Sequence, residues 1–262
     1  MQLVDIGANL THESFLHDLD DVLARARAHG IARLVVTGAS AQGSRDALAL
    51  AKAHPGFLSA TAGVHPHHAS DFDADVGALL RELHAQPEIV AVGETGLDYH
   101  RNFSPREAQL FAFERQLQLA VESGKPLFLH QRDAHADFLR LMDSVRDRIG
   151  PAVVHCFTGE KDELFDYIDR DFYIGITGWI CDERRGVHLR EIVKHIPADR
   201  LLLETDAPYL LPRNVKPMPS HRRNEPMYLA HICHEVARDR GEDPHVTAAN
   251  STAAARRFFR LD

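Results

Sequence analysis

The stretch Ile89-Val90-Ala91-Val92-Gly93-Glu94 is a short apolar run that ends at a carboxylate, and the chain repeats this pattern. Such runs, with helical patterns between them, are typical of buried parallel strands in βα units. Eight units predict an α/β protein with a closed (β/α)8 TIM barrel, whose active site lies at the C-terminal ends of the strands. The runs cover residues 3–7, 33–38, 58–63, 89–93, 127–129, 152–154, 172–176 and 201–203, and the polar residues beyond six of them are Asn9, His65, Glu94, His130, His155 and Asp206.

Length and composition fit one enzyme domain of this kind. The chain has 262 residues, 44% hydrophobic and 26% charged, which predicts a single barrel over residues 1–262. The net charge of −8 argues against a broad basic face that grips nucleic acid. It still allows phosphate to be handled at one local site, where divalent cations supply positive charge.

The compartment is expected to be the cytoplasm. The start of the chain, Met1-Gln2-Leu3-Val4-Asp5, lacks the basic region of a signal peptide and enters a strand at once. No apolar run is long enough to span a membrane, so we expect no membrane partner. Cys156, Cys181 and Cys233 are three widely spaced cysteines, an odd and sparse set that indicates reduced thiols.

Helices are expected between the strands. The first should cover residues 14–29 and stop at Gly30. Another should cover 105–123, with Ser104-Pro105-Arg106-Glu107 as a capping box and Pro105 at its first position. Further helices are predicted at 134–148, 161–169, 187–195 and 224–239, and a last one begins at Asp243-Pro244 and ends near Phe259. The long Pro-rich segment 207–223 is predicted to be a basic wall of the site, or else a strap that closes the barrel.

Two histidines and two carboxylates form the predicted metal centre. His130 and His155 each follow an apolar run, and two histidines at the same end of consecutive strands favour ligation over a role in the core. Glu94 lies between glycines that permit close approach, and Asp206 could ligate a metal, orient a water or accept its proton. Imidazole suits zinc and manganese, while added carboxylates favour harder cations.

Other residues on the predicted rim are expected to contact substrate. His65 is placed to reach a phosphate or the leaving group. Arg132 could clamp a phosphate, or form an ion pair with Asp133 or Asp137. Asn9 could offer its amide oxygen to a hard cation, and Trp179 is the best candidate for stacking on a base. Four other aromatic residues are weaker candidates, namely Tyr99, Phe103, Phe157 and Tyr209.

The chain resembles the TatD family of metal-dependent deoxyribonucleases, within the amidohydrolase-like barrel hydrolases. The resemblance covers essentially the whole chain. It rests on Ala62-Gly63-Val64-His65-Pro66-His67, Gly93-Glu94-Thr95-Gly96-Leu97-Asp98, His130-Gln131-Arg132-Asp133-Ala134, His155-Cys156-Phe157-Thr158-Gly159, Gly178-Trp179-Ile180-Cys181-Asp182-Glu183-Arg184-Arg185-Gly186, Glu204-Thr205-Asp206-Ala207-Pro208-Tyr209-Leu210 and Arg222-Arg223-Asn224-Glu225-Pro226. Within the family, the chain resembles the bacterial protein after which the family is named more than its paralogues. This closer resemblance rests on Gly7, Asn9 and the Cys181–Gly186 stretch.

By this resemblance Glu94, His130 and His155 are metal ligands and Asp206 completes the centre. The implied activity is hydrolysis of single-stranded DNA, and of RNA, from the 3′ end with magnesium, or with manganese or zinc. The resemblance also suggests a cytoplasmic DNA-repair enzyme, which we expect to be a monomer. Many related barrels carry a His-x-His pair where this chain has Gly7 and Asn9, so one of two metal positions is expected to be weak or absent.

Two other functions remain open at this stage. The same barrel and ligands would serve an amide, lactone or aminoacyl-ester substrate, with little need for Arg132. A non-catalytic partner protein that inherited the barrel is disfavoured by the intact ligand set.

Overall fold

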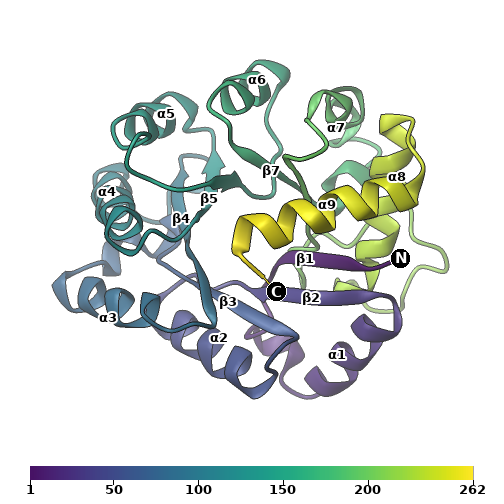
Figure 1. Ribbon diagram of the computed structural model, residues 1–262, viewed down its shortest axis with the longest axis horizontal. Coiled ribbons are helices and arrows are strands. Elements are labelled where there is room, and N and C mark those ends of the chain that lie inside the picture. Colours follow the sequence, from purple (N-terminus) through teal and green to yellow (C-terminus); the bar gives the residue numbers. More distant parts are fainter. Residues whose placement is uncertain (262) are drawn as a thin grey trace. The chain divides into compact units, whose positions relative to one another are not determined.

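Eight strands and the helices between them alternate along the computed structural model, which describes residues 1–261 (Figure 1). The strands form one sheet in sequence order, β1 to β8, as the sequence predicts for a (β/α)8 barrel. They are β1 Leu3–Ala8, β2 Ile31–Val36, β3 Leu58–Ala62, β4 Ile89–Asp98, β5 Leu127–Arg132, β6 Ala152–Val154, β7 Tyr173–Ile176 and β8 Leu201–Leu203.

The helices follow the strands in turn. The α-helices are α1 Leu19–Ala28, α2 Ala41–Ala53, α3 Ala74–His84, α4 Arg106–Ser123, α5 His135–Asp143, α6 Lys161–Asp169, α7 Val187–Ile192, α8 Leu229–Arg240 and α9 Pro244–Phe259. Short 3-10 helices are η1 Glu13–Phe15, η2 Pro66–Asp71, η3 Gly178–Cys181, η4 Val193–His195 and η5 Pro226–Tyr228. Among these described helices, none combines the length and the apolar composition needed to cross a membrane.

Contacts between residues divide the chain into two compact units. We call Val36–His155 the central unit, and Met1–Val35 with Cys156–Asp262 the terminal unit. Each is described by itself below. That residues 1–262 form one domain therefore stays a prediction.

The terminal unit joins the last strand to the first. Asp206 donates its backbone N–H to the carbonyl of Gly7 at 2.9 Å, and Asn9 donates to the carbonyl of Ala207 at 2.7 Å. Helix α9 lies alongside β1 (Figure 1) and begins where the sequence predicts, because the Asp243 side chain accepts the backbone N–H of His245. The predicted end of this helix near Phe259 is also confirmed.

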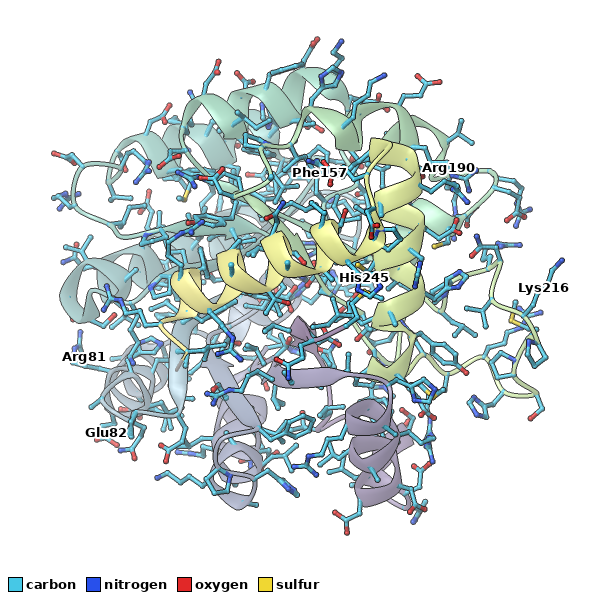
Figure 2. The ribbon with its side chains drawn as sticks, turned by 45° about the vertical axis from the view of Figure 1, so that its right-hand side comes forward. Arg81, Glu82, Phe157, Arg190, Lys216 and His245 are labelled. Atoms are coloured by element: carbon cyan, nitrogen blue, oxygen red, sulfur yellow. The ribbon has the colours of Figure 1, made fainter. Side chains whose placement is uncertain are left out.

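The segment after β8 is tied down by ion pairs. Arg223 donates both terminal nitrogens to the Asp18 carboxylate, at 2.8 and 2.6 Å, and also contacts Glu225. Arg213 pairs with Asp182 at 3.5 Å, so neither arginine presents an isolated positive charge. Lys216 is exposed, and its side chain points away from the ribbon at the outer edge of this segment (Figure 2). These contacts tie the segment to the rest of the terminal unit, as the strap predicts; the basic wall of the site stays a prediction.

The central unit holds strands β3 to β6, which pair in parallel in that order. Its core contains the fully buried rings of Phe113, Phe128 and Phe138. Helix α4 also buries two glutamines, whose amides bond to the main chain where β3 and β4 end: Gln116 with Val64, and Gln109 with Asp98. Each amide satisfies both an N–H and a carbonyl, so buried side chains hold the backbone in place at these two points.

Several predicted boundaries are wrong. The first helix is interrupted, with η1 at Glu13–Phe15 and α1 starting only at Leu19. Helix α5 ends at Asp143 rather than near residue 148. The predicted capping box does not form, because the Ser104 hydroxyl instead donates to the carbonyl of His67 at 3.0 Å. Strands β4 and β5 run on past their apolar parts, so Glu94 and His130 lie within strands rather than beyond them.

Candidate metal centre

One carboxylate oxygen of Glu94 is the centre of a histidine cluster in the central unit. Glu94 Oε1 lies 2.8 Å from His155 Nε2, 3.2 Å from His65 Nε2 and 3.2 Å from His130 Nδ1. Glu94, His65 and His155 are buried, and His130 is half-buried. The ring of Phe128 stacks on His155 with centroids 4.5 Å apart and so limits its rotation. The structure thus brings together four of the predicted site residues.

Two glycines let β4 approach β5 closely enough for this contact. Gly93 and Gly96 both have φ near +143°, a conformation that a side chain would strain. A Cβ at Gly93 would collide with the carbonyl oxygen of Phe128, and one at Gly96 with the carbonyl oxygen of His130. The β4–β5 register also shifts between Val92 and Thr95, on either side of Glu94. The glycines therefore serve the packing of two strands against each other.

The imidazole of His130 is clamped between two carboxylates. The register pairs Gly96 with His130, so Glu94 and Asp98 lie two residues before and after that point. Glu94 approaches His130 Nδ1, and Asp98 Oδ2 lies 3.2 Å from Nε2. Asp98 also accepts the backbone N–H groups of His100 and Arg101. Were a metal ion bound at Nδ1, the carboxylate at Nε2 would hold the remaining proton of the ring there.

His65 has the opposite arrangement and is a hydrogen-bond donor. Its Nδ1 accepts the backbone N–H of His67 at 3.0 Å, so that nitrogen carries no proton. Burial lowers the pKa of His65 to about 4, which keeps the ring neutral at physiological pH. The single proton of the neutral ring must then sit on Nε2, which faces Glu94. As a neutral ring whose one N–H faces Glu94, His65 is placed to donate a hydrogen bond.

The electrostatics of the cluster keep Glu94 charged. Burial alone would raise the pKa of Glu94, but His65, His155 and His130 outweigh it and hold this pKa well below its usual range. For His130, burial lowers the pKa, while its hydrogen bonds to Asp98 and Glu94 more than compensate and raise it. An ionised, buried carboxylate surrounded by imidazole nitrogens is an arrangement that a cation stabilises strongly.

The donor set fits a divalent metal ion. Ligand atoms of His65, Glu94 and His130 lie within 4.8 Å of one another. That Glu94, His130 and His155 are the residues that hold the ion stays a prediction; His155 also reaches the same Glu94 oxygen through its Nε2. The set combines imidazole and carboxylate, which suits zinc, manganese and related ions.

Asn9 and Asp206 pair with each other in the terminal unit. The Asn9 amide donates to Asp206 Oδ1 at 2.9 Å, so Asn9 orients this carboxylate. Asp206 itself has φ +53°, a left-handed conformation that is uncommon outside glycine and is held by its bond to Gly7. The predicted roles of both residues towards the metal stay predictions.

The neighbours of Arg132 and Trp179 bear on the roles predicted for these two residues. The two acidic residues considered as partners of Arg132 are engaged elsewhere, Asp133 with His100 and Asp137 with Tyr99. The guanidinium of Arg185 covers one face of the Trp179 ring, 4.3 Å from its centroid. Phosphate binding by Arg132 and base stacking by Trp179 stay predictions.

Two residues beside the cluster, Asp98 and His67, are not marked as site residues by the sequence patterns above. Asp98 contacts both His130 and His67, the latter at 2.9 Å. This bond to Asp98 places His67 beside the cluster. Asp98 follows Glu94 by four residues, and this even spacing within a strand was the signal that could have found it.

Comparison with known proteins gives the family. The profile of the family described as TatD related DNase matches residues 4–260. The chain belongs to this family. A relative from Erwinia tasmaniensis, named 3'-5' ssDNA/RNA exonuclease TatD, is 51% identical over 259 residues, which are 99% of this chain and all of the relative. A protein of the same name from Erwinia billingiae is 52% identical over 99% of both chains.

Solved structures agree with this assignment. YJJV, a TatD homologue from Escherichia coli K12, superposes with a TM-score of 0.89 at 26% identity over 99% of this chain and 98% of its own. A hydrolase of the TatD family from Entamoeba histolytica superposes with a TM-score of 0.87 at 25% identity over 100% and 99% of the two chains. The TatD family resemblance and the (β/α)8 fold predicted from the sequence are therefore confirmed.

Proposed function

We propose that this TatD family member is a divalent-metal-dependent exonuclease that shortens single-stranded DNA and RNA from the 3′ end. The observation that carries the proposal is the convergence of three imidazoles on one buried oxygen of Glu94. It occurs in a chain about half identical, over its whole length, to proteins named for this activity. The names of these relatives favour this function over the amide or ester hydrolase considered from the sequence.

Glu94, His130 and His155 would hold the ion. A divalent cation, when bound, supplies a Lewis acid for the phosphate and a nucleophile at neutral pH. Glu94 contributes the charge, while Phe128 packs on His155 and Asp98 contacts His130, which fixes the orientation of the two rings. We propose Asp206 as a further carboxylate of the reaction on the sequence argument alone.

His65 would act on the phosphate or on the leaving oxygen. Its Nε2 carries the only N–H of the neutral ring and faces Glu94, the carboxylate beside which the ion and its phosphate would lie. Hydrogen-bond donors that are fixed before the reaction stabilise developing charge without reorganisation. Arg132, at the end of β5, is proposed to add a second donor to the same phosphate.

We further propose magnesium as the working ion, with manganese or zinc as substitutes. Magnesium is commonly bound through one or two carboxylates together with substrate phosphates, which matches a reaction on nucleic acid. We also propose that the protein is a monomer that acts in the cytoplasm in DNA repair. These three features come from the family resemblance.

The test is degradation of labelled strands by metal-stripped protein. Single-stranded and duplex DNA, labelled at the 5′ or 3′ end, and single-stranded RNA would be incubated with magnesium, manganese or zinc. We expect stepwise shortening of single strands from the 3′ end, dependent on the ion. Glu94→Gln and His155→Ala, purified identically, should lose the activity, which excludes a contaminating nuclease.

A surface carboxylate provides the matched control. Glu122 pairs with Arg81 on the outside of the central unit, and Glu122→Gln should retain full activity. Equal activity in the wild type, Glu94→Gln and His155→Ala would refute the proposed site. No degradation with any ion would refute the nuclease function and direct attention to ester and amide substrates.

A further inference from the structure

The structure separates the aromatic residues that the sequence offers for base stacking. Phe157 is buried against Tyr167, and Tyr99 lies under the guanidinium of Arg106, 4.1 Å from its ring centroid. Trp179 has one face covered by Arg185, and Tyr209, which is 51% exposed, packs on His12 in the terminal unit. Phe103, by contrast, is 68% exposed, although it belongs to the loop that follows the ligand-bearing strand β4.

Phe103 packs beside the histidine cluster. Its ring lies edge-to-face on His67 with centroids 4.7 Å apart, and His67 packs in turn on His65 at 4.2 Å. Its neighbour Ser104 is buried and joins this loop to η2, donating to the carbonyl of His67 and accepting the backbone N–H of Ser70. Because these bonds order the backbone next to Phe103 and His67 supports its ring, less conformational entropy is lost when a flat ligand stacks on the ring.

The surroundings of Phe103 favour a nucleobase over a protein partner. His100, Arg101 and Asn102 precede it in the chain and are exposed, so polar and cationic residues adjoin the ring along the chain. A strand end whose phosphate reaches His65 would have its sugar and base within one nucleotide of this ring. Aromatic rings beside cationic groups are typical of single-strand recognition, because every base has a stackable face.

We infer that Phe103 is a stacking platform for the base of one of the two nucleotides that flank the scissile phosphate. This inference rests on the proposed nuclease function and adds a substrate contact to it. Stacking tolerates any base, so the residue selects unpaired strand ends without selecting sequence. A base paired in a duplex has its faces covered by its neighbours and is not available to the ring.

The test combines a change in the protein with a change in the substrate. Strands labelled at the 5′ end would carry either an ordinary nucleotide or an abasic analogue at the last or the penultimate 3′ position. Wild-type kcat/KM should fall by about tenfold to a hundredfold when the base is missing at one of these positions. Phe103→Ala should show a similar loss on the ordinary strand and little further loss on the abasic strand, while Phe103→Trp should retain the preference.

Phe111 provides a matched control, since it is an exposed phenylalanine of α4 that contacts Phe72 and Arg115. Phe111→Ala should leave both substrates unaffected. Equal loss on ordinary and abasic strands in Phe103→Ala would mean a structural role and overturn the inference, as would no loss at all. If the wild type degrades strands without preferring a base, only this inference fails. If it degrades none, the proposed function fails and the inference with it.

Discussion

Replacing Asp98 by Asn tests whether a carboxylate outside the ligand set controls the metal affinity. Asp98 Oδ1 accepts two backbone N–H groups, and Oδ2 faces His67 and His130. The side-chain oxygen of an asparagine can still accept the two backbone N–H groups, but its NH2 group cannot accept a hydrogen bond from His130 Nε2. The His130 proton is then expected to move to Nδ1, the nitrogen that faces Glu94.

The expected magnitude follows from this change of tautomer. Loss of the partner that orients a ligating histidine lowers metal affinity by about tenfold to a hundredfold. The fold should survive, because the backbone contacts of residue 98 remain and a lost charged hydrogen bond costs about 1.5–3 kcal/mol. Calorimetric titration of metal-stripped protein with manganese measures the affinity directly, and urea unfolding measures the stability.

Asp73→Asn is the control for the same chemical change in the same unit. The Asp73 side chain accepts the backbone N–H of Val76 at the start of α3, and Asn caps a helix about as well as Asp. This variant should bind manganese like the wild type. A manganese affinity of Asp98→Asn equal to that of the wild type would show that Asp98 does not position His130, and the reasoning would be wrong.

Three further changes probe the fold and its charges. Burial raises the pKa of the Asp5 carboxyl from 3.8 to about 7, although hydrogen bonds from Thr205 act to lower it. Between these two pH values the folded state binds one proton more than the unfolded state. The free energy of unfolding therefore falls as pH rises through this window. Urea unfolding from about pH 5 to pH 8 should show this slope in the wild type and not in Asp5→Asn. Gly96→Ala should lower the free energy of unfolding by about 3 kcal/mol or more, because the added Cβ collides with β5. Gly56→Ala, where nothing lies within 4 Å of the added Cβ, should lower it by only about 1–2 kcal/mol, because of the positive φ. Chemical denaturation measures both values. Arg223→Lys keeps the charge but loses the two-pronged contact with Asp18, so the segment after β8 should be cut faster by trypsin; unchanged cleavage would argue against the strap.

The sequence predicted the fold well because strand runs and helical periods are local signals. Each apolar run corresponds to an observed strand, and α6 and α9 begin and end at the expected residues. The convergence of Glu94, His130 and His155 was also predictable, since parallel strands in consecutive βα units bring their ends to one edge.

The parts that failed depend on contacts between distant residues. Ser104 looks like a helix cap in sequence, and only the position of His67 shows that its hydroxyl is used elsewhere. The proton position on His65 is set by a backbone N–H two residues later, which no residue pattern encodes. Apolar composition marks where a buried run ends, but not where strand pairing ends, so β4 and β5 were predicted too short.

The clamp on His130 also constrains how the length of this chain can vary during evolution. Glu94 and Asp98 reach the ring because they stand at equal distances on either side of Gly96, the residue paired with His130. A single residue inserted or deleted between Glu94 and Asp98 would turn one carboxylate to the other side of the strand. A substitution between them does not change the side on which either carboxylate lies. Variation in length is therefore expected to accumulate in the connections, such as residues 207–223, while the five positions from Glu94 to Asp98 keep a constant count.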